Sequence, residues 1–586
     1  MSNFSWMIAR SVRIWPFRAL SPSAAWNLHG FHRNRIPISL SAATGAAPVS
    51  VRHSVPHSGF EWRCCCLRRD EDTKRKRQEG SFVAAHSSLP RVRAVATNAA
   101  VAVAGDVAPK AASTCRPLGN SLSFCIVGSG PAGFYTAERL LKSYPHATVD
   151  IVEKLPSPFG LVRSGVAPDH PETKAVINQF SRLASVERCK FWGNVQVGRD
   201  VSVAELRQYY NAVVFAYGAE GDKTLGIPGE DYKGVVSARE FVWWYNGHPE
   251  YAGLPIDLTG TDTAVVLGQG NVALDCARVL LRDVDELAKT DIAEHALEAL
   301  RESRIRTVLL VGRRGPAQAA CTAKELREVL GLRSIRVLVK LSDTSLTEVD
   351  QEELKNSRSR RRVHELFVKA GNESGNAADT DRQINFTFFR APKEILGKQI
   401  EGGHCADGLR LERTMLQGGG GGKPQRAVGT GEMEDLPCGL VLRSIGYKSL
   451  PLPGLPFDNA RGIVPNKEGR IIGEGEEGSD KYERGMYVVG WVKRGPTGII
   501  GTNLVCADQT VASIAEDEKQ GLLPSTESNK GTIGLMQLLS HRQTQVVDFE
   551  GWNKIAREEV RRGALKGKPR EKILSIEEML KLSRAD

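Results

Sequence analysis

The chain has 586 residues, of which 41% are hydrophobic and 25% are charged, so it is long enough to form two or more domains with large cores. It contains no run of about 18 apolar residues, which excludes a membrane-spanning helix. Its 11 cysteines include no CxxC or CxxxxC pair, which argues against a disulfide scaffold, a zinc ribbon and a cysteine-ligated cluster. We therefore expect no bound metal.

The net charge of +11 belongs to the first fifth of the chain. Residues 1–118 hold 17 Lys and Arg against 6 Asp and Glu, whereas the remaining residues carry 62 of each sign and are neutral. This distribution removes most of the support for nucleic-acid binding. Residues 1–60 contain six arginines, ten serines and no acid, which is typical of an organelle transit peptide, although an ordinary tail remains an alternative. The composition fits a mitochondrial or a plastid signal.

A dinucleotide-binding fingerprint begins with a predicted strand over 121–127. A glycine-rich turn, a helix over 134–143 and a second strand over 148–152 follow, and Glu153 stands 20 residues after the third glycine. The small residues of the turn let the backbone approach a pyrophosphate: Gly128, Gly130, Ala132 and Gly133. Glu153 would accept from ribose hydroxyls, which disfavours a 2′-phosphate, so this site suits FAD or NAD.

The same pattern recurs 140 residues later, with a strand over 263–267 and a helix over 274–281. Alanine occupies the third glycine position, a permitted variant. The next strand, 307–311, is followed by Arg313 and Arg314 rather than by an acid. Because guanidinium groups match a phosphate, the second site should prefer NADP over NAD.

One chain with both sites indicates a flavoenzyme that uses FAD and NADPH. Such an enzyme passes a hydride from the nicotinamide to the flavin, which then needs an acceptor. A disulfide reductase would use a cysteine pair, and none occurs at the usual spacing.

Residues 119 to about 520 resemble the adrenodoxin reductase family, the NADPH:ferredoxin oxidoreductases of mitochondria and some bacteria. The resemblance is carried by VGSGPAGFY (127–135), EKLPSPFGLVRSGVAPDHP (153–171), FWGNVQVGRD (191–200), GQGNVALD (268–275), VGRRGP (311–316), GEMEDLPCGLVLRSIGY (431–447) and GWVKRGPTG (490–498). The tail, with FEGW at 549–552 and GKPR at 567–570, resembles the long form of plant and bacterial relatives more than the shorter animal form.

The resemblance implies an α/β chain with two Rossmann-like domains in a glutathione-reductase-like architecture, the NADP domain inserted into a discontinuous FAD domain. The expected parts are a transit peptide and linker (1–118), the first FAD segment (119–222), the NADP domain (223–446), the second FAD segment (447–520) and a C-terminal extension (521–586). We expect a rigid non-helical loop over 156–171, a returning strand over 441–447, a helix over 502–515, surface loops over 371–384 and 417–431, and one helix near 576–583.

The resemblance also implies site residues. FAD contacts would be Ala132, Glu153, Leu161 and Val197, with Trp491, Gly498, Ile499 and Ile500 at the flavin ring and near the nicotinamide. The NADP pyrophosphate would be held by Gln269, Gly270, Asn271 and Val272, and the adenosine ribose with its 2′-phosphate by Arg313, Arg314 and Glu325. His170 and Asp275 would pair near the flavin and, with Trp491, are the candidate catalytic residues. A satisfied loop histidine and a packing tryptophan are the plain alternatives, and we assign no acid–base residue.

The expected acceptor is a small acidic [2Fe–2S] ferredoxin that serves iron–sulfur assembly or P450-type enzymes. A neutral chain needs a local basic patch to bind it, and the candidates are Lys324, Arg327, Arg358, Arg360, Arg361 and Arg362, a solvated charge run being the alternative. Charge reversal at Arg360 and Arg362 should then raise the ferredoxin KM. A glutamate-synthase-type reductase subunit and a non-catalytic NADP-responsive binding protein are the other candidate functions. The family favours the mitochondrion, in the matrix or at the inner-membrane periphery, which is compatible with peripheral membrane association; a plastid is the alternative.

Overall fold

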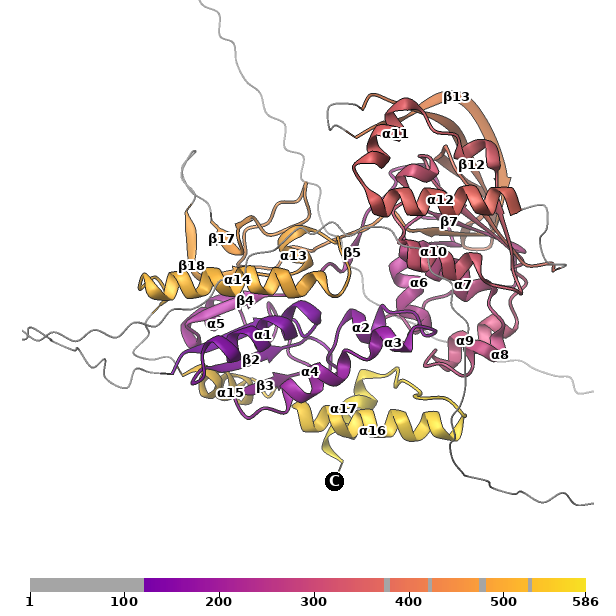
Figure 1. Ribbon diagram of the computed structural model, residues 1–586. Helices are drawn as coiled ribbons and strands as arrows, with labels where there is room; N and C mark the ends of the chain where they lie inside the picture. Colours follow the sequence, from indigo (N-terminus) through magenta and orange to yellow (C-terminus); the bar gives the residue numbers. More distant parts are fainter. Residues whose placement is uncertain (1–120, 374–379, 420–423, 474–480, 525–529, 586) are drawn as a thin grey trace, which may run out of the picture. The chain divides into compact units, whose positions relative to one another are not determined.

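A computed structural model describes residues 121–373, 380–419, 424–473, 481–524 and 530–585. The expected transit peptide and linker, 1–118, lies outside these residues. The described residues form two sheets that are wholly or mainly parallel, two small antiparallel sheets and the helices that cover them (Figure 1). This arrangement confirms the expected α/β fold with two dinucleotide-binding domains. Among the described helices, none is both long and apolar enough to cross a bilayer.

The first sheet lies in the domain that is expected to bind FAD, which we call the FAD domain, and has the strand order β16-β17-β18-β4-β1-β2-β3, parallel from β18 to β3. Its strands are β1 (Ser123–Val127), β2 (Thr148–Val152), β3 (Cys189–Trp192), β4 (Ala212–Phe215), β16 (Asn466–Lys467), β17 (Arg470–Ile472) and β18 (Tyr482–Val488). Alternate β1 residues enter separate apolar clusters, Phe124 and Ile126 in one, Cys125 and Val127 in the other. Both faces are therefore covered, which explains the continuous apolar runs.

Two helices that are far apart in sequence pack together on this sheet, α1 and α14 (Figure 1). The helices of this domain are α1 (Pro131–Ser143), α2 (Leu161–Ser164), α3 (Pro171–Lys174), α4 (Ile177–Ala184), α5 (Val203–Tyr209), α13 (Trp491–Arg494) and α14 (Thr502–Lys519). The expectation of a wholly non-helical loop over 156–171 is wrong, because α2 makes one helical turn there. Gly160, at φ 45°, turns the chain into α2, and its carbonyl accepts from the amide of Ser164 at 3.0 Å.

The second sheet lies in the domain that is expected to bind NADP, which we call the NADP domain, and is parallel throughout, in the order β6-β14-β7-β8-β10-β9. Its strands are β6 (Val235–Ser237), β7 (Thr263–Leu267), β8 (Thr307–Val311), β9 (Arg336–Val339), β10 (Gln383–Thr387) and β14 (Leu440–Arg443). The helical segments are α6 (Ala238–Tyr245), α7 (Asn271–Leu281), α8 (Val284–Leu287), α9 (Glu294–Arg301), α10 (Ala323–Leu330), α11 (Glu348–Lys355) and α12 (Arg358–Glu373), with short 3₁₀ turns at Pro316–Gln318 and Leu341–Thr344. One face of this sheet packs on helices such as α6 and α7, and the other face packs on a further strand, β12 (Gly403–Gln417).

An antiparallel sheet of β11 (Arg390–Ile400), β12 (Gly403–Gln417) and β13 (Arg426–Pro437) covers that second face. The expected loop over 417–431 is therefore partly wrong, since β13 begins inside it. The expected returning strand over 441–447 is also divided. β14 stays in the NADP sheet, and only β15 (Tyr447–Lys448) pairs with β5 (Gly221–Asp222), so the outgoing and returning chains cross between the domains side by side.

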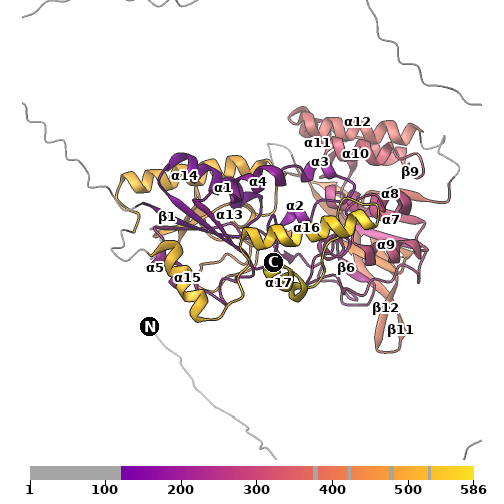
Figure 2. The ribbon, with the colours of Figure 1, turned by 90° about the horizontal axis from the view of Figure 1, so that it is seen from below.

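The C-terminal segment is helical: α15 (Gly531–His541), α16 (Phe549–Leu565) and α17 (Ile576–Arg584). The single helix expected near 576–583 corresponds to α17, and the sequence prediction missed α15 and α16. In α16 the buried Trp552 and Ile555 stand among charged neighbours, and they pack into the apolar cluster of the FAD domain. Figure 2 shows α16 alongside α2, and the ion pair between Arg163 of α2 and Glu559 of α16 connects the two helices.

Candidate active site

The first glycine-rich turn has little space except at its second glycine. Gly128 adopts φ 108°, and a Cβ there would lie 2.7 Å from the carbonyl oxygen of Ala216. A Cβ at Gly133 would lie 2.1 Å from the carbonyl oxygen of Gly128, whereas one at Gly130 would meet nothing within 4 Å. Gly130 therefore offers open space at the N-terminus of α1, where a pyrophosphate can approach the backbone.

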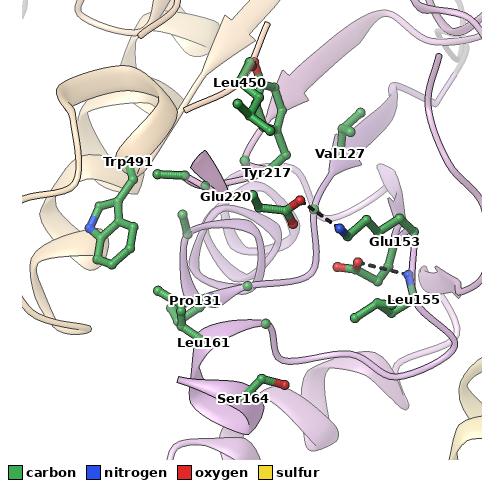
Figure 3. A pocket seen from close by; sticks show the side chains of 18 of the residues that line it. Val127, Pro131, Glu153, Leu155, Leu161, Ser164, Tyr217, Glu220, Leu450 and Trp491 are labelled. Atoms are coloured by element: carbon green, nitrogen blue, oxygen red, sulfur yellow. Dashed lines mark hydrogen bonds and ion pairs between the residues drawn. The ribbon is translucent and has the colours of Figure 1, made fainter. Parts of the chain in front are cut away.

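A cavity opens beside this turn (Figure 3). Nine of the residues expected to contact FAD line it: Gly128, Gly130, Ala132, Glu153, Leu161, Val197, Trp491, Ile499 and Ile500. Gly133 and Gly498 do not; Gly133 packs beneath the turn and Gly498 precedes the two isoleucines. Ile499 is 65% exposed, as expected for an apolar side chain that a bound ring would cover. Residues from both of the expected FAD segments thus line the cavity around the turn.

Glu153 lies at the end of β2, where the fingerprint requires an acid. Its Oε2 accepts from the amide of Ser129 at 3.0 Å and from the Ser129 hydroxyl at 2.6 Å, and its Oε1 accepts from the amide of Leu155 at 3.2 Å. Burial raises the pKa of Glu153, and these hydrogen bonds partly oppose that rise. The carboxylate is thus held in place at the wall of the cavity.

Several lining residues were not predicted from the sequence. Lys154 forms an ion pair with Glu220 at 2.7 Å (Figure 3). Trp243 lies on α6 and His248 lies just after it, and their rings stack with centroids 4.3 Å apart. Burial lowers the pKa of His248 to about 3, so its ring is neutral at neutral pH. Lys154 lies inside the 153–171 motif, where the sequence analysis did not single it out. No motif marks Glu220, Trp243 or His248, which tertiary folding alone brings to the cavity.

The second glycine-rich turn repeats the geometry of the first. Gly268 has φ 137°, with a Cβ position 2.3 Å from the carbonyl oxygen of Ser444, and Gly270 faces open space. Asn271 is the first residue of α7 and Val272 the second. The side chain of Gln269 turns inward and donates to the carbonyl of Leu310 at 3.1 Å, so only its backbone faces the turn. The turn fits a second pyrophosphate through its backbone amides.

Arg313 and Arg314 follow β8 as predicted. Arg313 is exposed and Arg314 is half-buried; burial lowers the pKa of Arg314, and the charges of Arg313 and Arg360 lower it further. The charge of Glu353 has the opposite effect and raises the pKa of Arg314. This excess of guanidinium groups suits a phosphate. Glu325 was expected beside the two arginines. In the structure its Oε2 lies 3.7 Å from Nε2 of His170.

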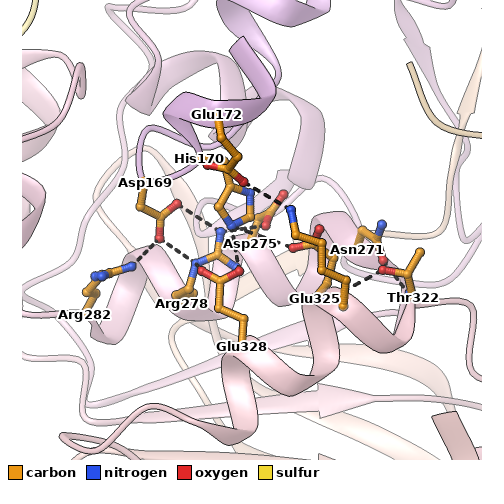
Figure 4. Close-up of polar contacts among 11 residues, drawn as sticks. Asp169, His170, Glu172, Asn271, Asp275, Arg278, Arg282, Thr322, Glu325 and Glu328 are labelled. Atoms are coloured by element: carbon orange, nitrogen blue, oxygen red, sulfur yellow. Dashed lines mark hydrogen bonds and ion pairs between the residues drawn. The ribbon is translucent and has the colours of Figure 1, made fainter. Parts of the chain in front are cut away.

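His170 and Asp275 meet different partners (Figure 4). His170 Nε2 lies 2.9 Å from Glu328 Oε2, while Asp275 accepts from the fully buried Arg278 at 2.8 Å. Arg278 also donates to Asp169 at 2.6 Å, so the two domains are linked through Asp169–Arg278 and His170–Glu328 and not through a His170–Asp275 hydrogen bond. Burial raises the pKa of Asp275 to about 6, against the charge of Arg278.

The four clustered arginines expected to dock a partner are exposed at the start of α12: Arg358, Arg360, Arg361 and Arg362. Arg360 lies 3.5 Å from Glu353, and Arg361 donates to the carbonyl of Lys355 at 3.1 Å. The other two candidates lie on α10, which packs against α12. There Arg327 is exposed, and Lys324 forms an ion pair with Glu172 of the FAD domain at 3.1 Å.

Comparison with known proteins assigns the chain to a family. A family model described as pyridine nucleotide-disulphide oxidoreductase matches residues 122–355. Fold and site therefore define a flavin- and pyridine-nucleotide-dependent oxidoreductase. The mitochondrial NADPH:adrenodoxin oxidoreductases of Arabidopsis thaliana and Homo sapiens are 56% and 51% identical over 461 and 465 residues, which is 78% of this chain and 95% and 91% of theirs. The chain belongs to the NADPH:adrenodoxin oxidoreductase family, whose cofactors are FAD and NADPH.

Bacterial relatives extend the comparison. NADPH-ferredoxin reductase FprA of Mycobacterium tuberculosis is 42% identical over 466 residues, 78% of this chain and 98% of the relative. A solved structure of FprA in complex with NADPH has a TM-score of 0.72 and 40% identity, covering 80% of this chain and all of the other. Plant, animal and bacterial relatives align with this chain over nearly equal lengths.

Proposed function

We propose that this chain transfers electrons from NADPH to an adrenodoxin-type [2Fe–2S] ferredoxin. The observation that carries the proposal is the pair of dinucleotide-binding turns in one chain, one followed by Glu153 and the other by Arg313 and Arg314. When bound, FAD accepts two electrons from NADPH and releases them one at a time. The chain's residues position both nucleotides, and no CxxC pair occurs in the sequence to receive the electrons. The ferredoxin would supply iron–sulfur assembly or P450-type enzymes.

The proposal is tested anaerobically with the FAD-loaded protein. NADPH should bleach the flavin absorbance, and oxidised [2Fe–2S] ferredoxin should restore it in one-electron steps. Bleaching without recovery would retain the flavoenzyme and remove the ferredoxin from the account. Recovery that needs a glutamate synthase subunit with glutamine and 2-oxoglutarate, in place of the ferredoxin, would favour the glutamate-synthase-type alternative. Nucleotide binding without any bleaching would favour a non-catalytic binding protein.

The cofactor preference should depend on Arg314. Because one hydrogen-bonded guanidinium–phosphate contact contributes about 1.5–3 kcal/mol, Arg314→Gln should lower kcat/KM for NADPH about 10–100-fold and leave kcat/KM for NADH nearly unchanged. The measurement is steady-state ferricyanide reduction with each nucleotide. Arg333→Gln, an exposed arginine of the same domain, is the control. An equal loss with both nucleotides would refute a 2′-phosphate contact.

The start of α12 is the proposed docking surface. Arginines in the first turn oppose the helix dipole, and Arg358 and Arg362 repel each other at i,i+4, so an acidic partner would relieve both costs. Neither residue forms an ion pair with a described side chain. Arg360 is less suitable for a test, because it pairs with Glu353 and its charge also lowers the pKa of Arg314. These features favour a ferredoxin contact at Arg358 and Arg362.

Combined Arg358→Glu and Arg362→Glu changes should raise the ferredoxin KM at least about tenfold at low ionic strength and less at high ionic strength. Ferricyanide reduction should stay unchanged, because this small acceptor needs no docking patch. Lys369→Glu, further along α12, controls for a general charge effect. Unaltered ferredoxin kinetics in the double variant would move the docking surface elsewhere.

We infer a mitochondrial location from the acid-free, arginine-rich leader and from relatives named mitochondrial. The matrix or the inner-membrane periphery would then be the site of action. A fluorescent protein fused behind residues 1–118 should accumulate in mitochondria. Accumulation in plastids would instead support the alternative reading of the leader.

A further inference from the structure

A second cavity, of about 420 Å³, opens where three parts of the chain meet. Its wall comes from the FAD domain between residues 159 and 178, from 289–291 of the NADP domain, and from Trp552 with 569–572 of the C-terminal segment. Its volume is within the range of small-molecule sites. None of the residues expected to contact FAD, NADPH or ferredoxin lines it.

Two lysines in this wall, both little exposed, share a single carboxylate. Lys174 lies 2.6 Å and Lys572 lies 3.4 Å from the Asp291 oxygens, and the two lysine side chains are 11% and 2% exposed. Lys572 also donates to the amide oxygen of Asn246 at 3.2 Å. Asp291 therefore balances only one of the two ammonium groups.

Two arginines beside the same cavity also share one carboxylate. Arg163 binds Glu559 through both terminal nitrogens, at 2.9 and 2.5 Å, and Arg570 donates to Glu559 at 2.7 Å. Glu559 is fully buried, and Arg163 is 7% exposed. The two clusters together carry four cations and two anions. Lys289, exposed at the rim, adds a further positive charge.

Buried charges without counter-ions are costly. Burial lowers the pKa of Lys174, and it lowers the pKa of Lys572 to about 7; neighbouring cations add to both shifts. Asp291 is a single carboxylate paired with two cations. Lys572 and Lys174 lower its pKa to about 2, although its burial acts to raise the pKa. An anion in the cavity would stabilise every one of these cations.

The cavity also has an aromatic wall. The guanidinium of Arg163 lies 5.0 Å from the ring centroid of Trp552, which meets the ring of Phe159 edge-on at 6.0 Å. Both aromatic residues line the cavity, together with three prolines. A ligand that combined an anionic group with an apolar body could therefore contact both kinds of wall.

We propose that this cavity binds a small phosphate monoester with an apolar or aromatic body. A phosphate monoester carries close to two negative charges at neutral pH, and an anion beside Lys572 favours the charged form of that lysine. The bound ester can therefore balance both surplus cations of the two clusters, whereas a carboxylate would neutralise only one. Ammonium and guanidinium groups provide charge-assisted donors to the phosphate oxygens. The body lies against Trp552 and Phe159.

The test is isothermal titration of the full chain, saturated with FAD and NADP⁺, with phenyl phosphate as the probe. We expect one site, no measurable binding of benzyl alcohol, and competition by inorganic phosphate. Lys289→Glu should weaken phenyl phosphate at least about tenfold, since it reverses the charge at the rim without touching the buried clusters. Lys519→Glu, an exposed lysine at the end of α14, should bind as the unmodified protein does.

A second variant tests the charge balance. Lys572→Met removes one surplus cation, so the preference for phenyl phosphate over benzoate should fall. Lys289→Glu still reports on the site if this core variant does not fold. Absence of phenyl phosphate binding to the unmodified protein, or equal affinity in Lys289→Glu and Lys519→Glu, would overturn the proposal.

Discussion

Gly128→Val is expected to yield a protein that carries no FAD. Gly128 has φ 108°, a conformation that costs a valine about 1–3 kcal/mol before any contact is counted. The new Cβ would also lie 2.7–2.8 Å from backbone atoms of Ala216 and Tyr217, at the end of β4. Because these backbone atoms directly follow β4 and cannot give way as the end of a flexible side chain could, the turn must move, and the pyrophosphate site moves with it. Flavin absorbance per mole of purified protein measures the loss.

Two further glycines separate this effect from general glycine replacement. A Cβ at Gly253 meets nothing within 4 Å and Gly253 does not line the cavity, so Gly253→Ala should bind FAD fully. A Cβ at Gly130 is equally unobstructed but points into the proposed pyrophosphate space, so Gly130→Ala should fold and bind FAD more weakly. Stoichiometric FAD in Gly128→Val would show that the first turn does not hold the cofactor.

Glu559→Gln should lower the free energy of unfolding by about 3–5 kcal/mol, the cost of breaking a buried ion pair on one side. Glu559 is fully buried, and it accepts from Arg163, from Arg570 and, at 3.1 Å, from the amide of Ile573. The neutral amide would leave both guanidinium groups without their counter-ion. Urea unfolding followed by tryptophan fluorescence measures the change.

The neighbouring acid provides a matched control. Glu558 pairs with Arg561 and Arg562 on the outer side of the same helix, so Glu558→Gln should cost less than about 1 kcal/mol. Glu559→Gln should also release FAD faster, because Arg163 belongs to α2, whose Leu161 and Ser164 line the FAD cavity. Equal effects of the two substitutions would mean that α16 does not support the FAD loop.

Local patterns predicted the elements around both glycine-rich turns well. β2, β7 and β8 have the expected bounds, since each is a short apolar run limited by polar residues and glycine. The acid after β2 and the arginines after β8 were found for the same reason: the fingerprint fixes their distance along the chain.

Contacts between distant segments could not be predicted in this way. Arg163 and Glu559 are separated by 396 residues, and neither neighbourhood shows a motif that pairs them. The same holds for Trp243 and His248 at the cavity, and for the partners of His170, which are acids of α10 rather than Asp275. The family resemblance named residues near the site, and only the folded chain assigned their partners.

The most direct test of the central claim is NADPH-dependent reduction of cytochrome c by the FAD-loaded protein, with and without a [2Fe–2S] ferredoxin. We predict slow reduction by the enzyme alone and strong, saturable stimulation by ferredoxin. Oxidation of NADPH by ferricyanide with no response to any ferredoxin would contradict ferredoxin as the acceptor.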